Sequence, residues 1–189
     1  MFEAFGISTL VVAVGEIGDK TQLLALLLAC RFRKPVPILL GILAATIANH
    51  GVAGFFGAWI RGQFTPDTLR WLVGVTFLAI AAWALVPDKL EDEAPKPVGR
   101  YGVFLLTFVA FFLAEIGDKT QLATVALAAR FDSLLAVVCG TTLGMMIADA
   151  PAVLLAERLT QKLSFKLIRF IAAGLFAALG IAALLSAAF

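Results

Sequence analysis

The chain has 189 residues, of which 61% are hydrophobic and only 15% are charged, and its formal net charge is +2. With a mean hydropathy of +0.99, it lacks the polar surface of a soluble domain, in which about 25% of residues are charged, and the composition indicates a polytopic membrane protein. The basic residues are spread over loops, so the small positive charge gives no indication of nucleic-acid binding.

Six apolar segments follow one another along the chain. Each is long enough to cross about 30 Å of hydrocarbon as a helix. Barrel strands are about half this length and alternate in polarity, so the segments predict helices. We therefore expect an all-α membrane protein with six transmembrane helices. The segments cover residues 5–30, 36–60, 68–86, 101–129, 134–156 and 165–188.

A polar linker separates the first three segments from the last three. It covers residues 87–100 and contains an acidic run. We expect a solvated cytoplasmic loop here. The linker divides the chain into a first three-helix repeat, residues 1–86, and a second three-helix repeat, residues 101–189.

The distribution of lysine and arginine predicts the orientation, since cytoplasmic loops are enriched in both. The side that holds the first, third and fifth loops carries Arg31, Arg33, Lys34, Lys89, Lys96, Arg100, Arg158, Lys162, Lys166 and Arg169, whereas the other side carries Arg61, Arg70 and Arg130. We expect the first side to be cytoplasmic and both termini to lie outside. The start of the chain has no basic n-region and no small-residue cleavage site, so we expect the first segment to remain as a transmembrane helix.

An octapeptide occurs twice in the chain. The sequence Glu-Ile-Gly-Asp-Lys-Thr-Gln-Leu occupies residues 16–23 and, 99 positions later, residues 115–122. Both copies lie near the middle of long apolar segments. Since each half has three helices, an odd number, the second half enters the bilayer from the opposite side. This arrangement is the inverted-topology repeat of secondary transporters, whose sites lie near the midplane where the halves meet.

The acidic residues of the octapeptide are the candidate ligands. A charge at mid-membrane costs roughly 2.5–3.5 kcal/mol on insertion scales, so a repeated cluster of charges there indicates a function. On a helix, Glu16 and Asp19 share a face, as do Glu115 and Asp118, and we expect the four carboxylates to converge. The neutral oxygens of Thr21, Thr120, Gln22 and Gln121 are available beside them. Such an all-oxygen set suits hard divalent cations such as Ca²⁺, Mg²⁺ and Mn²⁺.

The lysines and glycines of the octapeptide have supporting roles in this interpretation. Lys20 and Lys119 follow the glutamates by four positions, in the favourable order for an ion pair along a helix. Gly18 and Gly117 weaken the helix and allow local unwinding or close approach of another helix. Four carboxylates and two lysines carry a net charge of −2, which one divalent cation neutralises. Without the cation the carboxylates should take up protons, and this competition is the basis of an exchanger.

Three further polar residues lie in the middle of other segments. His50 and Asp149 occupy equivalent positions in the two halves, and Asn49 precedes His50. They are candidates for proton carriers or accessory ligands, and the alternative is a hydrogen-bonded contact between helices. Cys30 and Cys139 form no CxxC motif and no Cys/His cluster, so the sequence predicts neither a disulfide framework nor a thiolate metal site.

The tandem Glu-x-Gly-Asp-Lys-Thr motifs, one in the first segment of each half, resemble the Mn²⁺/Ca²⁺:H⁺ exchanger family that includes Golgi transmembrane protein 165 and bacterial manganese exporters. The resemblance covers essentially the whole chain. It implies a cation/proton antiporter without a resident cofactor, whose cation site is formed by Glu16, Asp19, Glu115 and Asp118 and whose transported ions are Mn²⁺ or Ca²⁺ and H⁺. It also implies a bacterial inner-membrane protein that exports manganese.

Other functions are open at the level of sequence. An intramembrane aspartyl protease would use Asp19 and Asp118 as its dyad, although the Glu and Lys beside each Asp do not suit a shared proton. A non-transporting membrane scaffold and an exporter of small organic cations are further alternatives. We expect a transporter rather than an enzyme.

Overall fold

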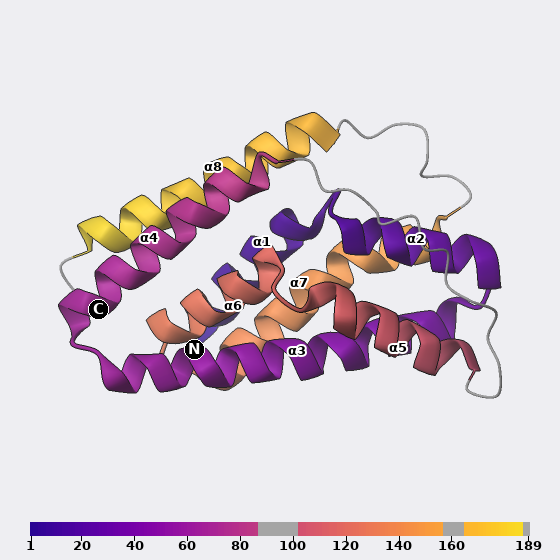
Figure 1. Cartoon of the computed structure of the whole chain (residues 1–189), viewed down its shortest axis with the longest axis horizontal. Helices are drawn as coiled ribbons and strands as arrows, with labels where there is room; N and C mark the ends of the chain where they lie inside the picture. Colours follow the sequence, from indigo (N-terminus) through magenta and orange to yellow (C-terminus); the bar gives the residue numbers. More distant parts are fainter. Residues whose placement is uncertain (87–101, 157–164, 187–189) are drawn as a thin grey trace.

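The computed structural model describes residues 1–86, 102–156 and 165–186, and over these ranges it contains helices and no strands. The expected all-α class is confirmed, whereas the expected linker, 87–100, lies outside the described residues. The helices are α1 (Phe2–Glu16), α2 (Lys20–Phe32), α3 (Pro35–Gln63), α4 (Pro66–Ala84), α5 (Gly102–Glu115), α6 (Lys119–Arg130), α7 (Leu134–Leu154) and α8 (Phe165–Leu185) (Figure 1).

The first and fourth predicted segments are not continuous helices. The prediction of one helix over 5–30 and one over 101–129 is wrong, because each segment is divided into two shorter helices at the octapeptide. The glycine of each copy has a positive φ, 81° at Gly18 and 77° at Gly117, which a right-handed helix cannot contain. The local unwinding predicted for these glycines is therefore present.

The other predicted segments end within three residues of the helices in the structure. Proline occupies the first position of α3 and of α4, where its missing N–H is not needed and its fixed φ suits the helix. Three helices in the described residues, α3, α4 and α7, are long and apolar enough to cross a membrane on their own. Gly102–Glu115 and Phe170–Leu185 are shorter apolar helices.

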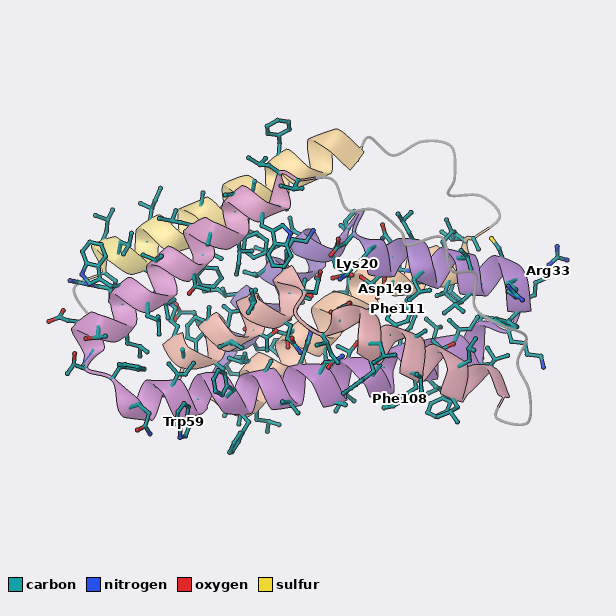
Figure 2. All side chains as sticks on the ribbon, in the orientation of Figure 1. Lys20, Arg33, Trp59, Phe108, Phe111 and Asp149 are labelled. Carbon is teal, nitrogen blue, oxygen red and sulfur yellow. The ribbon has the colours of Figure 1, made fainter. Side chains whose placement is uncertain are left out.

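The distribution of polarity differs from that in a soluble protein, because large apolar side chains cover the exterior and charged groups lie inside. Large apolar side chains such as Phe55, Trp59 and Leu113 are more than half exposed, while carboxylates such as Glu16 and Glu115 are completely buried. Figure 2 shows Trp59 and Phe108 pointing outward from the helices. An apolar exterior with carboxylates buried inside suits a protein whose surface faces lipid.

The helices pack in pairs that correspond between the two halves. Helix α1 packs on α7 and α5 packs on α3, while α2 packs on α7 and α6 packs on α3. Where α1 packs on α7, Gly140 allows α7 to approach the carbonyl oxygen of Phe5. Where α5 packs on α3, Gly41, which lies 99 positions before Gly140, allows α3 to approach the carbonyl oxygen of Phe104. A Cβ on either glycine would lie under 3.0 Å from that oxygen. The repeat in the sequence is therefore also a repeat in the packing.

The two broken helices meet in the interior. Figure 1 shows the α1–α2 break and the α5–α6 break near the middle of the long axis, with α3 along one edge and α4 beside α8 along the other. Helix α1 contacts α6, and α2 contacts α5. The two octapeptides are thereby brought to the centre of the molecule.

Candidate functional site

Each octapeptide forms a turn between two helices. Helix α1 ends at Glu16 and α2 begins at Lys20, so that Asp19 is the extended residue before α2; Asp118 occupies the same place before α6. In both turns the aspartate amide donates to the carbonyl oxygen of the glutamate, over 3.0 Å in the first copy and 3.1 Å in the second. The positive ends of two helices therefore lie beside the two aspartates.

The glutamines stabilise these turns. The Gln22 Oε1 atom accepts the amide of Gly18 at 2.8 Å, and Gln121 Oε1 accepts that of Gly117 at 2.7 Å. Gln22 Nε2 also donates to the carbonyl oxygen of Ala148, at 2.8 Å, which ties α2 to α7. The amide oxygens predicted to be available to a cation are thus directed at backbone donors.

Three carboxylates from the two octapeptides form one buried cluster. Glu16, Asp19 and Asp118 each place a carboxylate oxygen within 4.8 Å of the other two, and each is at most 2% exposed. Three oxygens this close leave some point within about 2.8 Å of all of them, near the calcium–oxygen distance of about 2.3–2.6 Å. Both oxygens of Glu16 are buried without a hydrogen-bond partner, so they are available to a ligand.

The fourth carboxylate, Glu115, lies beside this cluster. The Thr120 hydroxyl donates to Glu115 Oε2 at 3.1 Å and lies 3.4 Å from Asp118 Oδ2. Glu115 is also close enough to Glu16 to interact with it electrostatically. The expected convergence of four carboxylates is thus seen as a group of three with the fourth adjoining. Thr21 is fully buried at the position of α2 that corresponds to Thr120.

The lysines pair across the two halves. Lys20 Nζ lies 3.1 Å from Asp118 Oδ1, and Lys119 Nζ lies 3.0 Å from Asp19 Oδ1. The predicted pairing of each lysine with the glutamate four residues before it is wrong as a helical contact, because no helix continues from Glu16 to Lys20 or from Glu115 to Lys119. Each octapeptide instead supplies the counter-ion for the other.

The site carries an excess of buried negative charge. The four carboxylates are at most 2% exposed, and in the part of the chain that the structure describes two of them, Asp118 and Asp19, form ion pairs with ammonium groups. Asp149 in α7 is also completely buried and interacts electrostatically with Glu115 and Glu16. Both of its oxygens lack a hydrogen-bond partner. Buried charge in such excess requires bound cations or protons.

The remaining candidates, His50 and Asn49, differ from Asp149. The Asn49 side chain donates to the carbonyl oxygen of Phe112 at 3.1 Å and so ties α3 to α5. His50 is completely buried, and neither ring nitrogen has a hydrogen-bond partner. Figure 2 shows Lys20 and Asp149 near the middle of the long axis and Arg33 at one end.

The sequence contained a signal for the broken helices. Asp-Lys-Thr-Gln has the pattern of a capping box, in which an N-cap residue is followed three positions later by Glu or Gln. Placed directly after a glycine, this pattern predicts that one helix ends and another begins. The pairing of each lysine with the opposite aspartate had no such signal, because it depends on how the halves pack.

Comparison with known protein families finds a match over almost the whole chain. The sequence model of the family described as "Divalent cation/proton antiporter GDT1" matches residues 4–92 and matches again over residues 103–189. Both halves of the chain are therefore similar to the model of the same family. No solved structure matches the chain.

Curated relatives come from bacteria and plants. A Vibrio cholerae protein named "Putative manganese exporter" is 47% identical over 183 residues, which cover 96% of this chain and 90% of that protein. A rice protein named "GDT1-like protein 3" is 30% identical over 93% of this chain and 71% of its own length. Another rice protein, "GDT1-like protein 4", is 33% identical over 87% of this chain and 66% of its own.

Proposed function

This chain belongs to the GDT1 family of divalent cation/proton antiporters, and from that premise we propose that it exports Mn²⁺ from the cytoplasm in exchange for protons. The observation that carries the proposal is the buried group of Glu16, Asp19 and Asp118, whose carboxylate oxygens lie within 4.8 Å of one another. The protein is a transporter rather than an enzyme, since its family is one of antiporters.

The same carboxylates bind the cation in one state and protons in the other. Glu16, Asp19 and Asp118 are the proposed ligands, and Glu115 joins them from the position where Thr120 holds it. Because the cation needs ionised oxygens, protons compete with it directly. Asp149 and His50 are the proposed carriers of protons to or from the group, since both are fully buried with unused hydrogen-bonding capacity.

Manganese is the proposed cargo, with calcium as the second candidate. Both ions accept an all-oxygen ligand set, and the bacterial relative of 47% identity carries manganese in its name. The same name supports export as the proposed direction and a bacterial inner membrane as the proposed location. The excess of lysine and arginine in alternate loops assigns that side to the cytoplasm.

The proposed topology has six membrane crossings. The pairs α1–α2 and α5–α6 each cross as a broken helix, and α3, α4, α7 and α8 cross as single helices. The correspondence of helix contacts between the halves supports an inverted repeat. Access alternates as the halves move about the site that they share.

The alternatives raised by the sequence fit the site less well. A protease dyad shares a proton between two aspartates, but Asp19 and Asp118 are each paired with a lysine. A scaffold would not require Glu16 to be buried without a partner. A small organic cation would need more space than a group of oxygens 4.8 Å apart provides.

Proton flux in proteoliposomes tests the proposal. The purified protein is reconstituted with a pH dye inside the vesicles, and Mn²⁺, Ca²⁺ and Mg²⁺ are added outside in turn. We expect Mn²⁺ entry to expel protons and make the interior more alkaline. Glu16→Gln should abolish this signal, and Asp132→Asn, which weakens a surface ion pair to Arg61 at a fully exposed carboxylate, should leave it unchanged. Equal flux in Glu16→Gln and the unaltered protein would refute the site assignment.

A further inference from the structure

The crossed ion pairs occupy part of the proposed cation site. Asp19 and Asp118 belong to the group of oxygens that could surround a cation, and each also holds a lysine ammonium from the opposite half at about hydrogen-bond distance. An ammonium and a divalent cation compete for the same lone pairs. A cation that used both aspartates fully would have to loosen both pairs.

We infer that Lys20 and Lys119 are tethered counter-cations, which occupy Asp118 and Asp19 in the cation-free protein and which the incoming divalent cation displaces. This inference rests on the proposed function, since it assigns the event that accompanies loading of that site. It gives the lysines a positioning role: they act through the aspartates and do not touch the cation.

The pairs also fasten the two halves together at the site. Lys20 is the first residue of α2 and Asp118 is the N-cap residue of α6, while Lys119 is the first residue of α6 and Asp19 is the N-cap residue of α2. Both pairs therefore link the same two helix starts, in opposite directions. Displacing the lysines removes these links at the moment when the cation provides a new one between Asp19 and Asp118.

The two lysines differ in how easily they can leave. The Lys20 side chain is 30% exposed, whereas that of Lys119 is 4% exposed. The Lys20 side chain can leave Asp118 through the open side of the site, but the Lys119 side chain is enclosed and cannot leave Asp19 without movement of its neighbours. The cation accordingly displaces Lys20 first, and release of Lys119 accompanies the movement of the halves.

Equilibrium binding of Mn²⁺ to the full chain in lipid nanodiscs tests the inference. Lys20→Met removes the competing ammonium, so Mn²⁺ should bind more tightly to this variant. We expect the dissociation constant to fall about tenfold, which corresponds to a displacement cost of about 1.4 kcal/mol. Lys20→Arg keeps the positive charge, and its guanidinium can donate two hydrogen bonds to the Asp118 carboxylate. Mn²⁺ should therefore bind more weakly to this variant than to the unaltered protein. Lys34→Met, which removes an exposed lysine before α3, is the matched control and should not change the affinity.

Thermal unfolding provides a second readout. Lys20→Met leaves Asp118 buried without this partner, so its unfolding temperature without metal should fall, and saturating Mn²⁺ should raise it by more than in the unaltered protein. If Lys20→Met does not fold, Lys20→Gln retains a hydrogen-bond donor without the charge and should show the same order of affinities.

The affinities separate failure of the inference from failure of the proposed function. If the unaltered protein binds no Mn²⁺, the proposed function is wrong. If it binds Mn²⁺ but Lys20→Met binds equally or more weakly, the lysine does not compete with the cation and the inference is overturned. If Lys20→Met binds more tightly but Lys20→Arg matches the unaltered protein, only net charge matters, and displacement is likewise refuted.

Discussion

Thr120 is the residue that connects two of the four carboxylates. Its hydroxyl donates to Glu115 and lies near Asp118, while its backbone amide lies 3.4 Å from Asp118 Oδ2. A hydroxyl that donates to carboxylates fixes where their remaining lone pairs point. Thr120 therefore orients ligands without having to bind the cation itself.

Replacing Thr120 with valine keeps the shape of the side chain and removes the donor. Hydrogen bonds to charged groups contribute about 1.5–3 kcal/mol, so we expect Mn²⁺ affinity to fall about tenfold or more. Thr76→Val is the control, because Thr76 is partly exposed on α4 and, within the described ranges, its hydroxyl donates to the Leu72 carbonyl oxygen four residues before it and to no carboxylate. Titration calorimetry measures both, and equal affinities would show that the Thr120 hydroxyl has no such role.

The carboxylate oxygens also determine how binding depends on pH. Protonation removes a ligand, so Mn²⁺ binding should weaken as the pH falls, by about tenfold per pH unit for each proton that the cation displaces. Calorimetry in two buffers of different ionisation enthalpy counts the protons released. Affinity that is the same at pH 6 and pH 8, with no proton release, would contradict competition at shared oxygens.

At the scale of helices, the broken pairs α1–α2 and α5–α6 define the site. The length of the apolar runs in the sequence predicted where the segments lie, but a run of apolar residues does not show whether a helix is continuous. The glycine and the capping pattern after it did indicate a break. Treating Glu16 and Lys20 as neighbours on one continuous helix therefore predicted the wrong partner for the lysine.

The positive φ at Gly117 supplies a prediction at this scale. No atom lies within 4 Å of a Cβ built there, so Gly117→Ala should cost only the strain of a left-handed residue, about 1–2 kcal/mol. Gly102 is the matched control, since its φ is +72° and its Cβ position is equally open. Both variants should unfold at similarly lowered temperatures, but only Gly117→Ala should weaken Mn²⁺ binding.

That comparison separates strain from function. Gly102 begins α5, whereas Gly117 lies in the turn between Glu115 and Asp118. If the two variants bind Mn²⁺ equally well, the geometry of the turn does not control the site.

At the scale of the whole molecule, the internal repeat accounts for most of what the sequence predicted. The offset of 99 residues anticipated that two octapeptides face one another, and the corresponding approaches at Gly41 and Gly140 follow the same offset. The repeat did not predict that equivalent residues of the two halves differ in exposure. Lys20 is 30% exposed and Lys119 only 4%, although the surrounding octapeptides are identical.

This difference arises from packing beyond the repeat. Helix α4 packs on α6, and α8 packs on α1. In Figure 1 these four helices lie toward one end of the molecule, and α2 and α5 lie toward the other. Identical sequences in two different surroundings acquire different exposure. Sequence patterns alone do not encode that difference, since it depends on contacts among α1, α4, α6 and α8.

The most direct measurement of the central claim is the position of a bound Mn²⁺ ion. A crystal of the protein grown with Mn²⁺ and measured at the manganese absorption edge locates the ion by its anomalous scattering. We predict one strong peak between α2 and α6, with carboxylate oxygens of Glu16, Asp19 and Asp118 as ligands. A peak bound by residues of only one half, or outside the octapeptides, would contradict a single buried site shared by the two halves.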